Sequence, residues 1–368
     1  MGRSCSRTMT HPEQQSLDAI ATVAAHYHVP VEDALLIAVN LFGISSEQNR
    51  HRARITLRLT SVPDVPWMVI VPLNAARSPF KLMAQDLYLG KDLVGHVQRI
   101  DADEAVGGYF RHGGSAATLN PNARSRCVGC AFCPNTLEAA ADPRLAEQRE
   151  LAELLAAMTE QHPRHDLTEL SEVTVSTGCF QREDSAVSHL VGLRAVLRER
   201  GITARIGFLT SVIQSDAAFA DLAEAVAPFV LRLTAECFTR RDLLLKASKA
   251  RLPFDDMPEL LHRARSAGLG TSFTYVVGLD PLLELRTGVA ALVEQVSDFP
   301  NFQVYQAHNS IMAALRAPGA EHLEFYLQAR AEIEQIMGGK GLRPQAWECY
   351  RPLWYFTFAG HRLVAADD

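Results

Sequence analysis

Residues 204–236 read ARIGFLTSVIQSDAAFADLAEAVAPFVLRLTAE, which has the pattern of one strand–helix–strand unit. Two apolar, strand-like runs, Ala204–Thr210 and Phe229–Glu236, flank an amphipathic segment at 214–226 that is long enough for a crossover helix. Strands joined by such a helix pair in parallel, because antiparallel neighbours need only a short turn. The stretch therefore predicts a parallel sheet with helices outside it.

The same alternation continues on both sides of this unit. Further strand candidates are Ser171–Ser176, Thr271–Gly278 and Phe302–Ala307. Amphipathic segments lie between them at 144–160, 184–200, 254–267 and 281–297. With a first strand before Cys127, about six βα units are visible, which fits an α/β fold with a partial (βα)6 TIM-like barrel better than an eight-stranded one.

Three regions are expected along the chain. Residues 1–112 contain helical and strand-like patterns without a motif, and they predict an N-terminal α+β accessory region. Residues 113–310 form the partial barrel. Residues 311–368 are expected to pack a C-terminal helix, Glu321–Met337, and an aromatic tail on the barrel. The tail could be one more strand or a plug that closes the barrel base.

Composition narrows the class of protein. The 368 residues are 48% hydrophobic and 21% charged, which is typical of a globular chain with a sizeable core. A formal net charge of −6 argues against a nucleic-acid partner. No secretory signal and no apolar run of about 18 residues are visible, so we expect a cytoplasmic protein that does not enter a membrane. In a reducing compartment, clustered cysteines are more often metal ligands than disulfides.

Three of the seven cysteines stand together in Cys127-Val-Gly-Cys130-Ala-Phe-Cys133. A ferredoxin-type run would place a fourth cysteine at the position of Leu137. Three thiolates on an iron–sulfur cluster leave one iron without a protein ligand, and an open position on a metal can bind a substrate or cofactor. The run therefore indicates a reactive iron–sulfur site. A structural zinc site with His112 or another cysteine as fourth ligand, in a non-redox binding protein, stays open as an alternative.

With these cysteines in the loop after the first candidate strand, the chain resembles the radical S-adenosylmethionine (SAM) superfamily over roughly residues 115–310. The resemblance implies that Cys127, Cys130 and Cys133 hold a [4Fe–4S] cluster and that SAM chelates the open iron. One electron then cleaves SAM to a 5′-deoxyadenosyl radical, and a flavodoxin- or ferredoxin-type protein supplies that electron. The first cysteine gap is one residue shorter than the usual Cys-x3-Cys-x2-Cys, which keeps open a different cleavage with 3-amino-3-carboxypropyl transfer.

The resemblance also implies residues around SAM: an aromatic before the third cysteine, a turn after the second strand, a polar residue ending the fourth strand and a late strand glycine. In this chain they are Phe132, Ser176, Thr177, Gly178, Glu236 and Gly278. The turn lacks the acidic residue of the common Gly-Gly-Glu form. For the glycines the alternative is a conformational role, and for Glu236 it is an ion pair with Arg232 or Arg240.

Three further residues are candidates for the chemistry. Cys179 and Cys237 follow the same strand ends, where a thiol could donate a hydrogen atom to a substrate radical or ligate a second metal; the alternative is a small buried thiol. His308 could contact the substrate or SAM, or it could belong to a strand-end cap. The substrate expected by default is a small metabolite, such as an amino acid or a natural-product intermediate.

Overall fold

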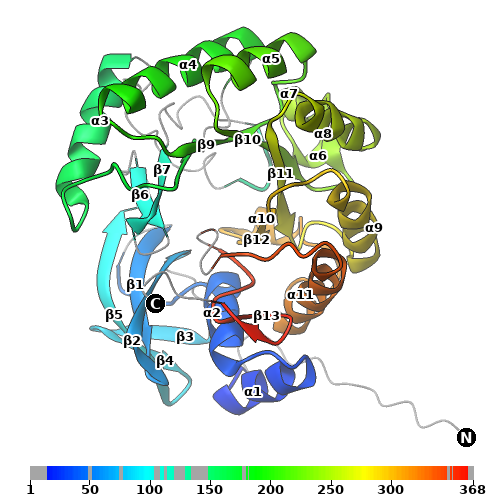
Figure 1. Cartoon of the computed structure of the whole chain (residues 1–368). Coiled ribbons are helices and arrows are strands. Elements are labelled where there is room, and N and C mark those ends of the chain that lie inside the picture. The colour runs from blue at the N-terminus through cyan, green and yellow to red at the C-terminus, as the bar shows by residue number, and fades with distance from the viewer. Residues whose placement is uncertain are drawn as a thin grey trace, which may run out of the picture.

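A curled sheet dominates the fold (Figure 1). The computed structural model describes residues 15–48, 52–73, 78–102, 108–111, 114–119, 129–133, 148–175, 180, 182–345, 349 and 351–363. The strand order of the large sheet is β12-β11-β10-β9-β8-β7-β6. The strands are β6 (Gly108–Arg111), β7 (Ala116–Leu119), β8 (Glu172–Val175), β9 (Arg205–Thr210), β10 (Phe229–Glu236), β11 (Gly270–Val277) and β12 (Asn301–Val304).

All neighbours from β7 to β12 are parallel, and only β6 pairs with β7 in the antiparallel direction. Six parallel strands therefore form a half-barrel, and the predicted α/β class with a partial TIM-like barrel agrees with it. The predicted strand Phe229–Glu236 is confirmed at both ends, whereas β12 ends three residues before the predicted limit.

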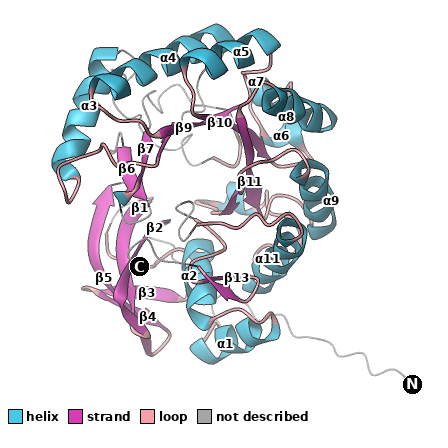
Figure 2. Cartoon of the chain, viewed as in Figure 1, coloured by secondary structure: helices cyan, strands magenta, loops and turns pink. Residues whose placement is uncertain are grey.

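Helices cover the outer face of this sheet (Figure 2). The longer ones are α3 (Gln148–Gln161), α4 (Glu183–Glu199), α5 (Asp216–Ala225), α8 (Met257–Ser266), α9 (Leu282–Val293) and α11 (Leu323–Gly338). Short turns connect them: α6 (Arg241–Leu244), α7 (Ala247–Ala250), η7 (Phe254–Asp256) and α10 (Ser310–Ala313). Local chemistry fixes where a helix begins, as in α5, where the Ser215 hydroxyl accepts a hydrogen bond from the Ala218 amide at 3.1 Å.

The N-terminal region is a helix pair followed by an antiparallel sheet. Helices α1 (Leu17–His26) and α2 (Val31–Phe42) precede β1 (Ala53–Leu59), β2 (Val62–Val71), β3 (Phe80–Met83), β4 (Asp86–Leu89) and β5 (Asp92–Ala102). The strand order is β2-β1-β5-β4-β3. The Gln306 amide, just beyond β12, donates to the Ile70 carbonyl of β2 at 2.7 Å, so this sheet packs against the half-barrel.

The aromatic tail forms a two-stranded hairpin, β13 (Thr357–Phe358) and β14 (His361–Arg362), that is separate from the barrel sheet. One backbone bond joins the tail to the barrel edge, because the Val304 amide of β12 donates to the Arg351 carbonyl at 2.9 Å. Trp354 packs edge-on against Phe299, just before β12, with ring centroids 5.2 Å apart. The tail therefore covers the start of β12 instead of adding a strand.

The two faces of the half-barrel differ in chemistry. On β10, Leu231 and Leu233 belong to the main hydrophobic core under the helices. Val230, Arg232 and Thr234 alternate with them and so point to the concave face. The polar side chains buried on the concave face are Thr118, Glu172, Thr174, Arg232, Thr234, Ser272, Thr274 and Asn301. Closed eight-stranded barrels fill this space with branched apolar residues, so a polar concave face indicates a binding site.

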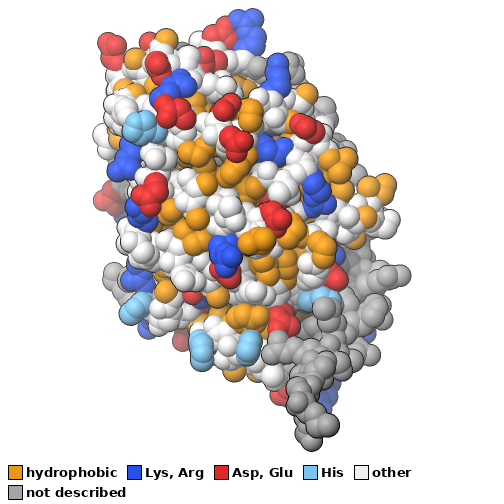
Figure 3. All heavy atoms as spheres, turned by 90° about the vertical axis from the view of Figure 1, so that its right-hand side faces the viewer, with side chains coloured by type: hydrophobic (Ala, Val, Ile, Leu, Met, Phe, Trp, Pro, Cys, Tyr) orange, Lys and Arg blue, Asp and Glu red, His pale blue; other side chains and the backbone are white. Residues whose placement is uncertain are grey.

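The outer helical surface mixes both signs of charge with apolar side chains (Figure 3). Its exposed large hydrophobic residues include Leu283 of α9 and Ile311 of α10. Among the described helices, none is long and apolar enough to cross a bilayer.

Candidate active site

The described part of the cysteine run lies at the carboxyl ends of the barrel strands. The Ala131 amide donates to the Leu244 carbonyl, in the turn that follows β10, at 2.9 Å. Cys130 and Phe132 are buried in a small apolar cluster whose other members come from β11 and the loops after β10, β11 and β12. These are Cys237, Leu244, Leu245, Val276, Leu279, Tyr305 and Met312. Ligand sites of parallel βα folds lie at this edge of the sheet.

The backbone around Cys130 is suited to a metal-bound thiolate. The Lys246 amide donates to Cys130 Sγ at 3.4 Å, and N–H bonds to sulfur tune iron–sulfur ligands. Gly129 has φ +108°, and a side chain there would press on Lys246 Cβ at 3.1 Å. Cys130 is buried and Cys133 is half-buried. Cys127 lies outside the described residues, and among those described no three histidine, cysteine or acidic side chains form a metal-binding group.

Glu236 ends β10 in a strained turn. Its φ is +63°, and the Cys237 amide donates across it to the Ala235 carbonyl at 2.7 Å, the hydrogen-bond pattern of a γ-turn. The register with β11 shifts at the same place, between Thr234 and Glu236. Such strain and bulges re-aim a side chain at functional sites.

The partner of Glu236 differs from both expected arginines. Lys249 of α7 reaches Glu236 Oε1 at 2.5 Å, with both side chains largely buried. Arg232 points to the concave face and pairs with Glu172 instead. Arg240 donates to the Leu279 and Leu315 carbonyls. The alternative of an ion pair for Glu236 is therefore confirmed, but the partner is Lys249 and not Arg232 or Arg240.

A buried carboxylate holds the loop after Glu236. Asp280 is fully buried and accepts hydrogen bonds from the Phe238 amide at 2.7 Å and the Thr239 amide at 3.0 Å. The Tyr275 hydroxyl donates to the same carboxylate at 2.9 Å. Burial, followed by the charge of Asp280, holds the pKa of Tyr275 well above its usual value, so this hydroxyl stays protonated. Asp280 therefore joins the loop after β10 to Tyr275 of β11 by hydrogen bonds.

Other predicted residues fall into three groups. Ser176, Thr177, Gly178 and Cys179 lie outside the described residues. Cys237 is fully buried, and burial first, then the Asp280 charge, raises the pKa of its thiol, as expected for a small buried thiol. His308 is partly buried next to Asn309, whose side chain caps α10 by accepting from the Met312 amide at 2.8 Å.

Gly278 has a conformational reason to be glycine. Its φ is +110°, and an added Cβ would lie 2.5 Å from the Tyr326 hydroxyl. The hydroxyl of Tyr326 donates to the Ala320 carbonyl at 3.1 Å, so it is anchored. The protein's own side chains therefore pack closely on this glycine.

A small pocket of about 10 Å³, room for about one water molecule, lies at the carboxyl ends of β9 and β10, beside the Cys130 loop. Its lining combines apolar side chains, hydroxyl groups and two lysines: Phe180, Leu209, Thr210, Ser211, Val212, Thr234, Lys246, Ser248 and Lys249. Lys246 lines the pocket and its amide donates to Cys130 Sγ, so the pocket lies next to the cysteine segment. Of the two lysines, Lys249 is paired with the Glu236 carboxylate. The sequence interpretation missed Lys246 and Lys249. Their spacing of three residues, downstream of β10, was visible in the sequence.

Below the pocket, an ion pair crosses the concave face. Arg232 of β10 donates to both oxygens of Glu172 of β8, at 2.9 and 3.0 Å. Arg205 of β9 reaches the same carboxylate at 2.7 Å. Gly207 lies on the intervening strand, where a Cβ would meet Arg232 Nε at 3.0 Å and Glu172 Oε1 at 3.2 Å. A glycine here leaves room for a buried ion pair that spans three strands.

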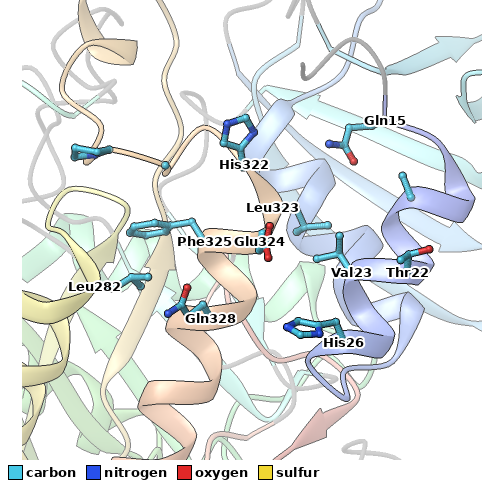
Figure 4. Close-up of a pocket in the computed structure, with 13 residues that line it drawn as sticks. Gln15, Thr22, Val23, His26, Leu282, His322, Leu323, Glu324, Phe325 and Gln328 are labelled. Carbon is cyan, nitrogen blue, oxygen red and sulfur yellow. The ribbon is translucent and has the colours of Figure 1, made fainter. Parts of the chain in front are cut away.

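A second pocket lies away from the cysteine loop, between α1, the start of α9 and the start of α11 (Figure 4). His26 comes from α1, and His322 and Glu324 come from the start of α11. None of the predicted site residues lines it. The carboxyl ends of the barrel strands, where Cys130 and Glu236 lie, are therefore the candidate active site.

Comparisons with known proteins identify no family. No protein-family model matches the chain, and no curated protein matches its sequence. Among solved structures, the chain is similar to SuiB of Streptococcus suis, crystallised with S-adenosylmethionine, at 11% identity and a TM-score of 0.36. The alignment covers 53% of this chain and 41% of SuiB, so the chain spans less than half of that protein.

Proposed function

We propose that this protein is a radical SAM enzyme that acts on a small metabolite. The observation that carries the proposal is the position of Cys130 and Cys133, over the carboxyl ends of β10, β11 and β12 and beside a pocket with two lysines. A zinc-stabilised scaffold needs neither a polar half-barrel nor a pocket beside its thiolates.

Cys127, Cys130 and Cys133 would hold a [4Fe–4S] cluster, since three thiols and an amide donor to sulfur suit it. When bound, the cluster would supply the electron that cleaves SAM. Lys246 and Lys249 bring positive charge to the pocket lining, and the Glu236 carboxylate that pairs with Lys249 would offer an acceptor for hydroxyl or amino hydrogens. Phe132 adds an aromatic side chain to the apolar cluster around Cys130, and the buried Asp280 holds the loop that follows Glu236.

The first test is iron and sulfide content with an absorption spectrum, measured anaerobically on the wild type and a Cys127/Cys130/Cys133→Ala variant. We expect about four irons and four sulfides per chain, absorbing near ~400 nm and absent from the variant. Zinc without iron after attempted reconstitution would contradict the proposal and favour the zinc-stabilised binding protein.

SAM cleavage products then separate the two iron–sulfur alternatives. 5′-Deoxyadenosine formed with a reduced flavodoxin or ferredoxin supports radical chemistry. 5′-Methylthioadenosine instead supports 3-amino-3-carboxypropyl transfer.

A further inference from the structure

A row of four polar side chains crosses the concave face at one level of the sheet. Thr234 of β10 is in register with Thr274 of β11, and Thr274 is in register with Asn301 of β12. Ser211, which follows β9, contacts the Thr234 hydroxyl. We call Ser211, Thr234, Thr274 and Asn301 the polar row; each is at least 94% buried, with exposed fractions of 4%, 3%, 2% and 6%.

The two halves of the row differ in hydrogen bonding. Ser211 and Thr234 bond to each other and line the pocket beside the cysteine loop. The Thr274 hydroxyl and Asn301 Oδ1 are buried and have no hydrogen-bond partner among the described residues. Leaving a buried polar group unsatisfied lowers the stability of the fold. Folding alone gives no reason to keep two of them side by side.

We infer that Thr274 and Asn301 bind the substrate, by accepting hydrogen bonds from its hydroxyl or amino groups. This inference rests on the proposed function, whose substrate it describes. Neighbouring strands lie about 4.8 Å apart, so one amino nitrogen or two adjacent hydroxyl groups can reach both acceptors. At the other end of the row, Ser211 and Thr234 line the pocket at the strand ends.

The same strand offers a matched control. Thr271 of β11 is also fully buried, but it faces the opposite way and its hydroxyl donates to the Gln295 carbonyl at 2.6 Å. Thr271→Val removes a hydroxyl group that forms a hydrogen bond. Thr274→Val removes a hydroxyl group that has no hydrogen-bond partner among the described residues. Both substitutions replace a threonine of β11 with valine, so each removes one hydroxyl group from the same strand.

Urea unfolding of the full chain tests the inference. We expect Thr274→Val to lower the unfolding equilibrium constant about fivefold and Thr271→Val to raise it about fivefold. A Thr274→Val variant that is destabilised as much as Thr271→Val would show that its hydroxyl has a structural partner and would overturn the inference.

Thermal midpoints with two probes test the ligand chemistry. Ribitol offers hydroxyl groups only, and putrescine offers amino groups only. A saturable rise with either probe at millimolar concentration, lost in Thr274→Val, supports the site and names its donor. If neither probe shifts the wild type, the ligand class is wrong. Neither the urea unfolding nor the thermal midpoints need SAM or iron. A protein without iron would therefore refute the proposed function and leave the test of Thr274 and Asn301 unaffected.

Discussion

The two faces of the half-barrel are built from the same strands but bury different kinds of side chain. The outer face buries apolar side chains such as Phe208, Leu231 and Phe273 under the helices. The concave face buries Glu172, Arg232 and unsatisfied acceptors at Thr274 and Asn301. Apolar burial stabilises the fold, whereas buried polar groups contribute little or cost stability. The comparison teaches that stability resides in the outer layer and that the inner layer is kept for recognition.

Truncating the outer layer should have the largest effect. Phe273→Ala on β11 should lower the free energy of unfolding by about 3–5 kcal/mol, because a fully buried ring leaves a cavity. Ser272→Ala, at the neighbouring position on the concave face, removes one hydroxyl bonded at 3.3 Å to the Phe299 carbonyl and should cost about 1 kcal/mol. Urea unfolding measures both, and equal losses would remove the contrast between the faces.

Breaking the concave ion pair should come next. Arg232→Met leaves Glu172 in a buried site with Arg205 as its remaining cation, and we expect a loss of about 3 kcal/mol. The double variant Arg232→Met/Glu172→Leu should recover most of that stability, since an apolar pair needs no compensating charge. Additive losses in the double variant would show that the two residues act independently.

The smallest effect is expected at the strand-end pocket and concerns binding. Lys249→Met removes a cation from the pocket and leaves the largely buried Glu236 carboxylate without its lysine partner, so the Kd for SAM should rise about tenfold. Equilibrium dialysis measures this, and Lys249→Arg should retain most of the affinity. Arg263→Met is the control, because Arg263 pairs with an exposed Asp216 and should leave SAM binding unchanged. An unchanged Kd in Lys249→Met would exclude this lysine from the cofactor site.

The half-barrel could be predicted from sequence because its strands are long apolar runs between amphipathic helices. Phe229–Glu236 is the clearest case. The N-terminal sheet could be predicted only in part, as strand-like patterns within an α+β region, since β3 and β4 have only four residues each and residues 80–112 carry no sustained period. The predicted helix at 281–297 ends early, at Val293, because α9 finishes where the chain turns toward β12.

The cysteine run was recognised from local spacing, whereas the rest of the site depends on tertiary contacts. Nothing local indicates that Lys249 meets Glu236 or that Arg232 reaches Glu172 across a strand. One signal was available: Arg232 and Thr234 interrupt a strand that helices cover, where a continuous apolar run is expected. Polar residues at every second position of a buried parallel strand predict a functional interior.

The contact between Gln306 and the Ile70 carbonyl has a consequence for how this fold can diversify. A closed barrel has a circumference fixed by its strand number and backbone register. Here the half-barrel and the N-terminal sheet share no strand pairing among the described residues, and side chains such as Gln306 join them. Substitutions at that seam can change how the N-terminal sheet meets the half-barrel without altering any strand pairing, while the cysteine loop at the other strand ends stays in place.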